Sequence, residues 1–259
     1  MGSYLDVGPT TLWYEEHGTG EPLVLLHGGL GDGRVFYNNL AALSDQFRVF
    51  QVDLRGHGRS PDPPGPLGPA QFTDDLVAFL EKAVGAKATL AGYSVGATTA
   101  LLTAVARPDL VDRLVLISGV FHRDGWLMPP STEGGVPPVL AQLYAEVTPH
   151  EPDHIEVVLG KLAEAARTEP ALTPTDLSAV HCRTMVMAAD DDLVDVQHTL
   201  ALYQALPNAE LTIVPGTSHN LLLEKPELCT RLVREFLTNP PVPTTIPIRR
   251  RPPHHSPGR

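Results

Sequence analysis

Hydrophobic and polar positions along this chain follow two different periods. Short apolar runs, which are typical of strands, occupy residues 11–17, 23–27, 48–53, 87–93, 113–118, 184–189 and 210–214. Segments with helical spacing of apolar residues occupy residues 35–43, 71–84, 95–106, 196–205 and 227–238. Strands that alternate with helices are typical of a mostly parallel sheet with helices on both faces, so we expect an α/β fold.

One interval, between residues 118 and 184, lacks a strand-like run. It begins with a loop rich in Pro and Gly, and two stretches follow, starting at Val139 and Ile155, whose apolar residues share one helical face. We predict that residues 120–179 form a helical cap inserted over the carboxyl edge of the sheet, and that residues 1–119 and 180–238 form the core. A pair of ordinary connecting helices is the alternative interpretation.

The composition changes at residue 239. Residues 239–259 contain seven prolines, four arginines and no acidic residue. Such a segment cannot bury enough apolar surface to offset the entropy of folding, so we predict a disordered tail rich in Pro and Arg. Residues 1–238 then carry 15 basic residues against 30 acidic ones.

This charge balance limits the partners that the protein can bind. An acidic surface repels nucleic acid and anionic membranes. No apolar stretch approaches the ~20 residues needed to cross a bilayer, and the first residues lack the pattern of a signal peptide. Cys182 and Cys229 match no metal or redox spacing, and we interpret them as reduced thiols. We expect a cytoplasmic monomer or homodimer that acts on a small molecule.

The first candidate catalytic motif is Gly92-Tyr93-Ser94-Val95-Gly96, which lies between a strand-like and a helix-like segment. In a sharp turn from strand to helix, the central serine takes a strained conformation that exposes its hydroxyl, and the two glycines leave room for strand and helix. The N–H group of the next residue, Val95, has no helical partner and can face an oxyanion. Ser94 is therefore a candidate nucleophile.

A serine nucleophile needs a base and a carboxylate that orients the base. His219 follows the apolar run at residues 210–214, and Asp190, Asp191 and Asp192 follow the run at residues 184–189. Spacing favours Asp192, with Asp191 as the alternative. The turn His27-Gly28-Gly29-Leu30-Gly31 follows an earlier strand and can supply a second N–H group to an oxyanion. We assign that donor to Gly29, with Leu30 as the alternative.

With these motifs the chain resembles the α/β-hydrolase superfamily, in particular its capped bacterial branch of esterases, lactonases, perhydrolases and carbon–carbon bond hydrolases. Further matching stretches are residues 52–60 and 215–226, and the resemblance extends over residues 11–237. It implies that Ser94 is the nucleophile, that His219 is the general base and then the acid, and that Asp192 orients it. Val95 and Gly29 would form the oxyanion hole. The chain departs from the family at Ala189, where a glycine is usual.

Two other motifs compete with this interpretation. Residues 150–154, His-Glu-Pro-Asp-His, match a zinc protease pattern whose histidines must share a helical face, but Pro152 disfavours a helix through the motif. Residues 29–34 only partly match a dinucleotide-binding turn, because Arg34 replaces its third glycine. We therefore expect neither a metal nor a cofactor. His27 is interpreted as a structural residue that bonds to backbone beside the turn of Gly29, and His57 as part of a structural turn that holds the sheet edge.

The sequence thus predicts a serine hydrolase that cleaves an ester, lactone or thioester of a small, partly apolar molecule through an acyl-enzyme. Carbon–carbon bond hydrolysis or perhydrolysis by the same residues is one alternative, and a non-catalytic binding or biosynthetic accessory protein is another. Candidate substrate contacts are Leu30, Phe121, Trp126, Met128 and Tyr144. The last four could equally form the small core of the cap.

Overall fold

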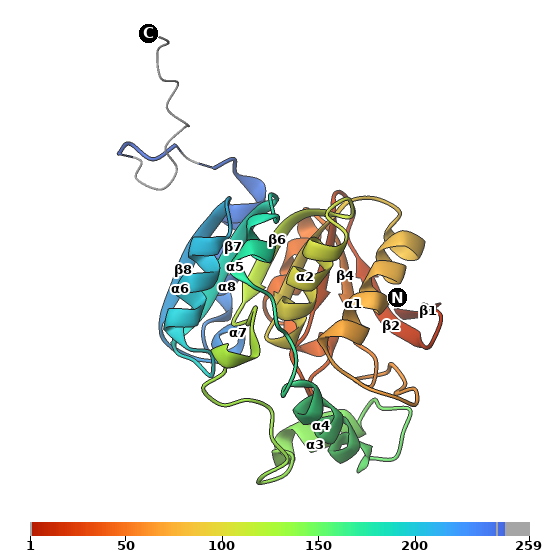
Figure 1. Cartoon of the computed structure of the whole chain (residues 1–259). Helices are drawn as coiled ribbons and strands as arrows, with labels where there is room; N and C mark the ends of the chain where they lie inside the picture. The colour runs from red at the N-terminus through yellow and green to blue at the C-terminus, as the bar shows by residue number, and fades with distance from the viewer. Residues whose placement is uncertain (1, 242, 247–259) are drawn as a thin grey trace.

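The computed structural model describes residues 2–241 and 243–246, and its centre is a sheet of eight strands (Figure 1). The strands are β1 (Gly2–Asp6), β2 (Thr11–His17), β3 (Pro22–Leu26), β4 (Arg48–Val52), β5 (Ala88–Tyr93), β6 (Val111–Ile117), β7 (Arg183–Asp191) and β8 (Ala209–Ser218). They lie in the order β1-β2-β4-β3-β5-β6-β7-β8, and only the pairs β1–β2 and β2–β4 are antiparallel. The expected mostly parallel sheet is confirmed.

Helices cover both faces of this sheet. Successive residues of a strand point to opposite faces, so neighbouring residues pack in different cores. Val24 belongs to a core with α1 (Pro69–Phe79), α2 (Val95–Ala106), α5 (Pro174–Ser178) and α6 (Val196–Ala205). Its neighbour Leu25 belongs to a second core with the 3-10 helices η1 (Gly33–Phe36) and η2 (Leu40–Asp45), together with α7 (Leu221–Glu224) and α8 (Pro226–Thr238). The central strands are therefore apolar at consecutive positions.

Three elements differ from the sequence prediction. The helix expected at residues 35–43 is wrong: the chain forms η1 and η2 there, and the Asn39 side chain accepts the N–H group of Leu40 and starts the second turn separately. Strand β1 was not predicted, because its residues are mostly polar and its partner is only β2 at the sheet edge. Helix α1 continues as the π-helical turn η3 (Leu80–Val84) and ends at Gly85, whose φ is 68°.

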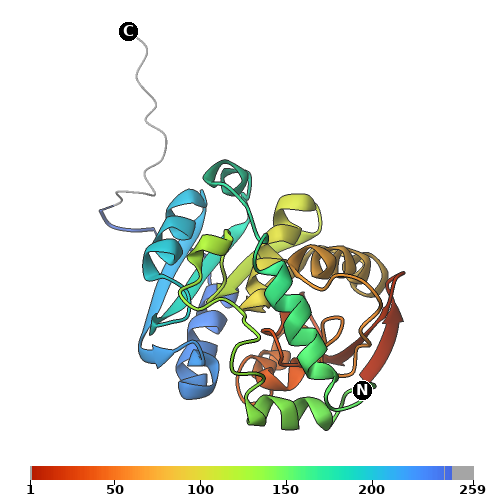
Figure 2. The same cartoon turned by 60° about the horizontal axis from the view of Figure 1, so that its bottom comes forward.

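The segment between β6 and β7 contains the turn η4 (Arg123–Gly125), then α3 (Pro138–Ala145) and α4 (His154–Ala165). Figure 1 shows α3 and α4 below the sheet, and Figure 2 shows α4 crossing in front of the molecule when that side is turned forward. The last helix of the segment, α5, packs beside α6 on the body of the protein. Of the helices in this segment, α3 and α4 therefore lie below the sheet in Figure 1, whereas α5 lies beside α6.

The chain leaves the fold after α8. The described residues that follow it, 239–241 and 243–246, form no helix or strand. The rest of the predicted tail, residues 242 and 247–259 with all four arginines, lies outside the described residues. Within the described part, no helix is long and apolar enough to cross a membrane.

Candidate active site

Ser94 occupies a tight turn between β5 and α2, with φ 57° and ψ −120°. Its N–H group donates to the carbonyl of Ile117 on the neighbouring strand β6 at 2.8 Å, which holds the turn against the sheet. A Cβ on Gly92 would overlap the carbonyl of Gly96, and a Cβ on Gly96 would overlap the carbonyl of Leu26. Both glycines are therefore needed for the strand and the helix to approach this closely.

His219 lies between Ser94 and Asp192. Its Nε2 is 3.0 Å from the Ser94 Oγ, and its Nδ1 is 2.6 Å from Asp192 Oδ1. With a carboxylate at Nδ1, the neutral ring carries its proton there and offers Nε2 as the acceptor for the serine hydroxyl. The Tyr93 hydroxyl donates to the His219 carbonyl at 2.9 Å and so fixes the loop that carries the histidine. These contacts join three side chains that the sequence analysis singled out.

The three consecutive aspartates have different partners. Asp192 is the one in contact with His219, and its side chain is only 2% exposed. Asp190 accepts the N–H groups of Gly216 and Thr217 at 2.9 and 3.0 Å. Asp191 is exposed and pairs with Ser218 in the sheet. Asp190 therefore supports the turn before His219, whereas Asp191 lies at the surface.

The Asp192 carboxylate is surrounded by hydrogen-bond donors. Besides His219, it accepts the hydroxyl of Ser118 at 2.5 Å and the N–H groups of Ala189 and Val194 at 3.1 and 3.3 Å. Burial alone would raise the pKa of this group, but the bonds from His219 and Ser118 outweigh it and lower the pKa below its usual range. The carboxylate is thus held in its charged form beside the imidazole.

The turn after β3 lies against Ser94. A Cβ on Gly28 would be 3.2 Å from the Ser94 Cβ, and a Cβ on Gly29 would be 4.0 Å from Val95 Cγ1. Leu30 has a positive φ of 58°, and Gly31 donates to the Gly28 carbonyl at 3.3 Å. Val95 is the first residue of α2, so its N–H group has no acceptor within the helix. The two candidate oxyanion donors, Gly29 and Val95, are therefore neighbours.

Apolar side chains surround this corner, and one of them comes from the cap. Leu162 belongs to α4, and its Cδ1 lies 3.4 Å from the position that a Cβ on Gly29 would occupy. Leu30 and Val95 pack on the same hydrophobic core as Leu162. Trp126 lies with its ring 6.2 Å from the His219 ring. Helix α4 therefore places an apolar side chain, Leu162, against the turn that carries Gly29.

The other candidate substrate contacts lie in different surroundings. Phe121 is buried and stacks on His198, with ring centroids 4.1 Å apart. Tyr144 is buried in α3, where burial raises the pKa of its hydroxyl. Met128 is 67% exposed, and no described contact places its side chain beside Ser94. Phe121 and Tyr144 thus pack within the protein.

The zinc-protease pattern at residues 150–154 does not form one helix, because α4 begins only at His154. Its two histidines instead hold Asp62 at the junction of cap and body. His150 accepts the Asp62 N–H at 2.8 Å, while His154 and Lys161 contact the Asp62 carboxylate at 2.9 and 2.7 Å. No group of three or more metal-binding side chains is found among the described residues. The motif therefore fastens the cap to the loop after β4.

His27 and His57 both bond to backbone, as predicted from the sequence for His27. His27 donates from Nδ1 to the Gly28 carbonyl at 2.7 Å and accepts the Leu54 N–H at 2.9 Å. His57 donates from Nδ1 to the Arg55 carbonyl at 2.8 Å, and complete burial lowers its pKa to about 3. Both rings are therefore held by backbone carbonyls, and the buried ring of His57 is neutral.

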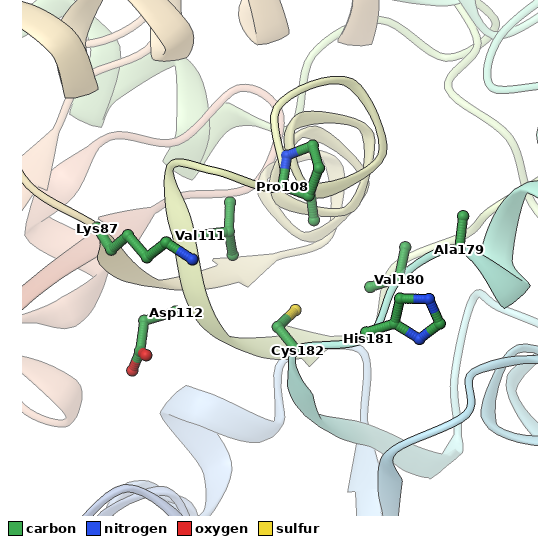
Figure 3. A pocket seen from close by; sticks show the side chains of 9 residues that line it. Lys87, Pro108, Val111, Asp112, Ala179, Val180, His181 and Cys182 are labelled. Carbon is green, nitrogen blue, oxygen red and sulfur yellow. The ribbon is translucent and has the colours of Figure 1, made fainter.

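A separate cavity of about 280 Å³ lies at the opposite end of the strands (Figure 3). It is lined by Lys87, Ala104, Pro108, Val111, Asp112, Ala179, Val180, His181 and Cys182, near the amino ends of β5, β6 and β7. Burial raises the pKa of the Cys182 thiol, which makes it a poor nucleophile. Because Ser94 follows the carboxyl end of β5, this cavity is not part of the candidate active site.

Sequence reasoning missed two residues of this site. Ser118 follows the apolar run of β6, so its place at the carboxyl edge of the sheet was a signal, but a lone serine carries no motif. Leu162 belongs to the apolar face of α4, and that face did not reveal which of its members would reach Gly29. Both contacts depend on neighbours distant in the sequence.

A strand-turn-helix serine joined to a histidine and an aspartate on a mostly parallel sheet defines the class of α/β hydrolases. Residues 23–232 match the model of the alpha/beta hydrolase family, and the chain belongs to this family of enzymes.

Comparisons with individual proteins agree with this assignment. The chain is 28% identical to the RutD protein of Caulobacter sp. (strain K31), which is named as a carbamate hydrolase, over 88% of this chain and 96% of that protein. It is 34% identical to the 2-(acetamidomethylene)succinate hydrolase of Mesorhizobium japonicum, over 44% of this chain and only 41% of that relative. The enol-lactonase from Burkholderia xenovorans LB400 has the same fold, with a TM-score of 0.74, 24% identity and coverage of 92% of this chain and 100% of that one.

Proposed function

We propose that this protein is a serine hydrolase that cleaves an ester, lactone or thioester of a small, partly apolar molecule through an acyl-enzyme. The observation that carries the proposal is the hydrogen-bonded series from Ser94 through His219 to Asp192, with spacings of 3.0 and 2.6 Å. In this proposal His219 takes the proton of Ser94 as Oγ attacks the carbonyl carbon. It then passes that proton to the leaving group and later activates water, while Asp192 stabilises the imidazolium.

The negative charge that develops on the carbonyl oxygen needs fixed donors. We assign this task to the N–H groups of Val95 and Gly29, because the first opens α2 and the second lies beside it in the turn after β3. Each donor of this kind lowers the barrier by roughly 3–4 kcal/mol in serine hydrolases. His27 supports this turn through the bond from its Nδ1 to the Gly28 carbonyl.

The substrate class is inferred from the surroundings of Ser94. The neighbouring side chains Leu30, Val95 and Leu162 are apolar. A compact apolar acyl group suits such a wall, whereas a substrate carboxylate would find no free cation among these residues. The relatives named as hydrolases of a carbamate and of an acetamidomethylene succinate suggest that bonds related to esters belong in the substrate panel.

Two alternatives use the same scaffold. Carbon–carbon bond hydrolysis or perhydrolysis would employ the same three side chains, with selection made by the cap. A non-catalytic binding protein would keep the fold without an activated serine. Bound ester that is never cleaved would favour this last possibility.

The proposal is tested with p-nitrophenyl esters of graded acyl length, a γ-lactone and an acyl thioester. We expect turnover of short apolar esters, with a rapid initial release of about one p-nitrophenolate per enzyme wherever deacylation limits the rate. A dienone substrate, followed by the loss of its absorbance, tests carbon–carbon cleavage in parallel. Absence of turnover across the whole panel by folded protein would contradict the proposal.

A further inference from the structure

Ser118 is the residue that follows β6, and it has an unusual backbone. Its φ is 50°, in the left-handed region that side chains other than glycine seldom adopt. It is 1% exposed, and its N–H group donates to the Met187 carbonyl on the neighbouring strand β7 at 2.8 Å. Such a conformation is strained for a residue with a Cβ, so it needs compensation from its surroundings.

The compensating contact is a hydrogen bond to the acid of the candidate active site. The Ser118 hydroxyl donates to Oδ2 of Asp192 at 2.5 Å. The other oxygen, Oδ1, contacts His219 Nδ1 at 2.6 Å and the Val194 N–H at 3.3 Å. Without Ser118, Oδ2 would keep only the N–H group of Ala189 at 3.1 Å. The serine is thus the side chain that fixes the carboxylate from the side opposite the histidine.

We propose that Ser118 is a positioning residue of the catalytic centre: its hydroxyl sets the rotation of the Asp192 carboxylate so that Oδ1 stays aligned with His219 Nδ1. This inference rests on the proposed function for its kinetic consequences. Ser118 acts only through Asp192. Its left-handed backbone aims the hydroxyl at Asp192 Oδ2 while its N–H group stays bonded to β7.

The first test compares Ser118→Ala and Ser118→Gly with the wild type on the best ester substrate. We expect kcat to fall about tenfold to hundredfold in both variants, because small errors of alignment have effects of this size, and KM to change little. Ser118→Gly relieves the strained φ, so it controls for folding defects of Ser118→Ala. Wild-type kcat in Ser118→Gly would show that only the backbone matters, and would overturn the proposal.

A double-mutant cycle separates positioning from a general structural role. In the Asp192→Asn background, Ser118→Ala should lower kcat by less than about threefold, because the carboxylate on which it acts is gone. An undiminished additional loss in that background would mean that Ser118 acts elsewhere, which would contradict the proposal.

A spectroscopic test needs no substrate. The Nδ1–H proton of His219 is followed by proton NMR in the downfield region and is assigned by its loss in His219→Gln. In Ser118→Ala we expect this resonance to shift upfield and to disappear at a higher pH on acidification than in the wild type, because Asp192 loses a donor that lowers its pKa. An unchanged resonance and an unchanged pH dependence would overturn the positioning role. Failure of the proposed hydrolase function would instead appear as a wild type without turnover, whatever the NMR result.

Discussion

The Nε2 atom of His219 lies 3.0 Å from the Oγ atom of Ser94, although 125 residues separate them in the sequence. The parallel sheet explains this contact. Ser94 follows the carboxyl end of β5, and His219 follows the carboxyl end of β8, so both residues are at the same edge. Asp192, after β7, reaches the histidine from the same edge.

Replacement of the candidate nucleophile should abolish catalysis without unfolding the protein. We expect Ser94→Ala to lower kcat on an ester by about 10⁶-fold, because no other group forms the acyl-enzyme. The circular dichroism spectrum and the melting temperature of Ser94→Ala should remain close to those of the wild type. Ser94→Gly should be more stable than Ser94→Ala, because glycine relieves the strain of the positive φ. Retention of activity within tenfold of wild type by pure Ser94→Ala would exclude this serine.

The aspartates offer a matched pair of substitutions. Asp192→Asn should lower kcat by about 10⁴-fold, because the amide favours the wrong tautomer of the histidine. Asp191→Asn, one residue away and exposed, should leave kcat within about twofold of wild type, as surface substitutions usually do. Steady-state kinetics of the two variants compares them directly. The reverse pattern would assign the acid to Asp191.

The cap should control the length of the acyl group. Leu162→Ala opens space at Gly29, so the ratio of kcat/KM for octanoyl over acetyl ester should rise about tenfold or more. The same change should lower the free energy of unfolding by about 2–4 kcal/mol, since a buried leucine is truncated. Val157→Ala, at an exposed position of the same helix, is the control. An unaltered preference in Leu162→Ala would remove this residue from the substrate wall.

His198 should make the protein less stable as the pH falls. Burial lowers the pKa of His198 to about 4, and its Nε2 accepts the Phe121 N–H at 3.2 Å. The unfolded chain binds a proton on this histidine near the usual pKa of about 6.5, so stability falls as the pH decreases from about 6.5 to 4. In His198→Gln, which can accept the same bond without titrating, the fall should be shallower.

Urea unfolding of wild type and His198→Gln at several pH values measures this effect. His57, whose pKa of about 3 acts in the same direction, is present in both proteins and cancels in the comparison. Equal pH dependence of the two proteins would show that His198 protonates as readily in the folded state as in the unfolded one.

Much of the fold follows from local patterns in the sequence. Strands and helices with strong apolar periodicity were predicted within a few residues, and α2 and α6 have the predicted bounds. The polar edge strand β1 carries no such pattern, and it forms by pairing with β2. Residues 35–43 have helical spacing, but the side chain of Asn39 caps a new turn within them.

The candidate site shows the same division. Ser94, Asp192 and His219 could be selected because motif and chain order restrict where they occur. Ser118 and Leu162 could not, because a hydroxyl bonded to Asp192 and a methyl group beside Gly29 result from packing between distant segments. Met128, chosen for its apolar side chain, is mostly exposed, since the loop that carries it runs along the surface.

The most direct test of the central claim is labelling with a fluorophosphonate, read by intact mass, on wild type beside Ser94→Ala. An activated serine attacks the phosphorus, displaces fluoride and keeps the phosphonyl group. We predict a single adduct on the wild type, located at Ser94 by peptide mapping, and none on the variant. A folded wild type that remains unlabelled, or an adduct that persists in Ser94→Ala, would contradict the assignment of Ser94 as the nucleophile.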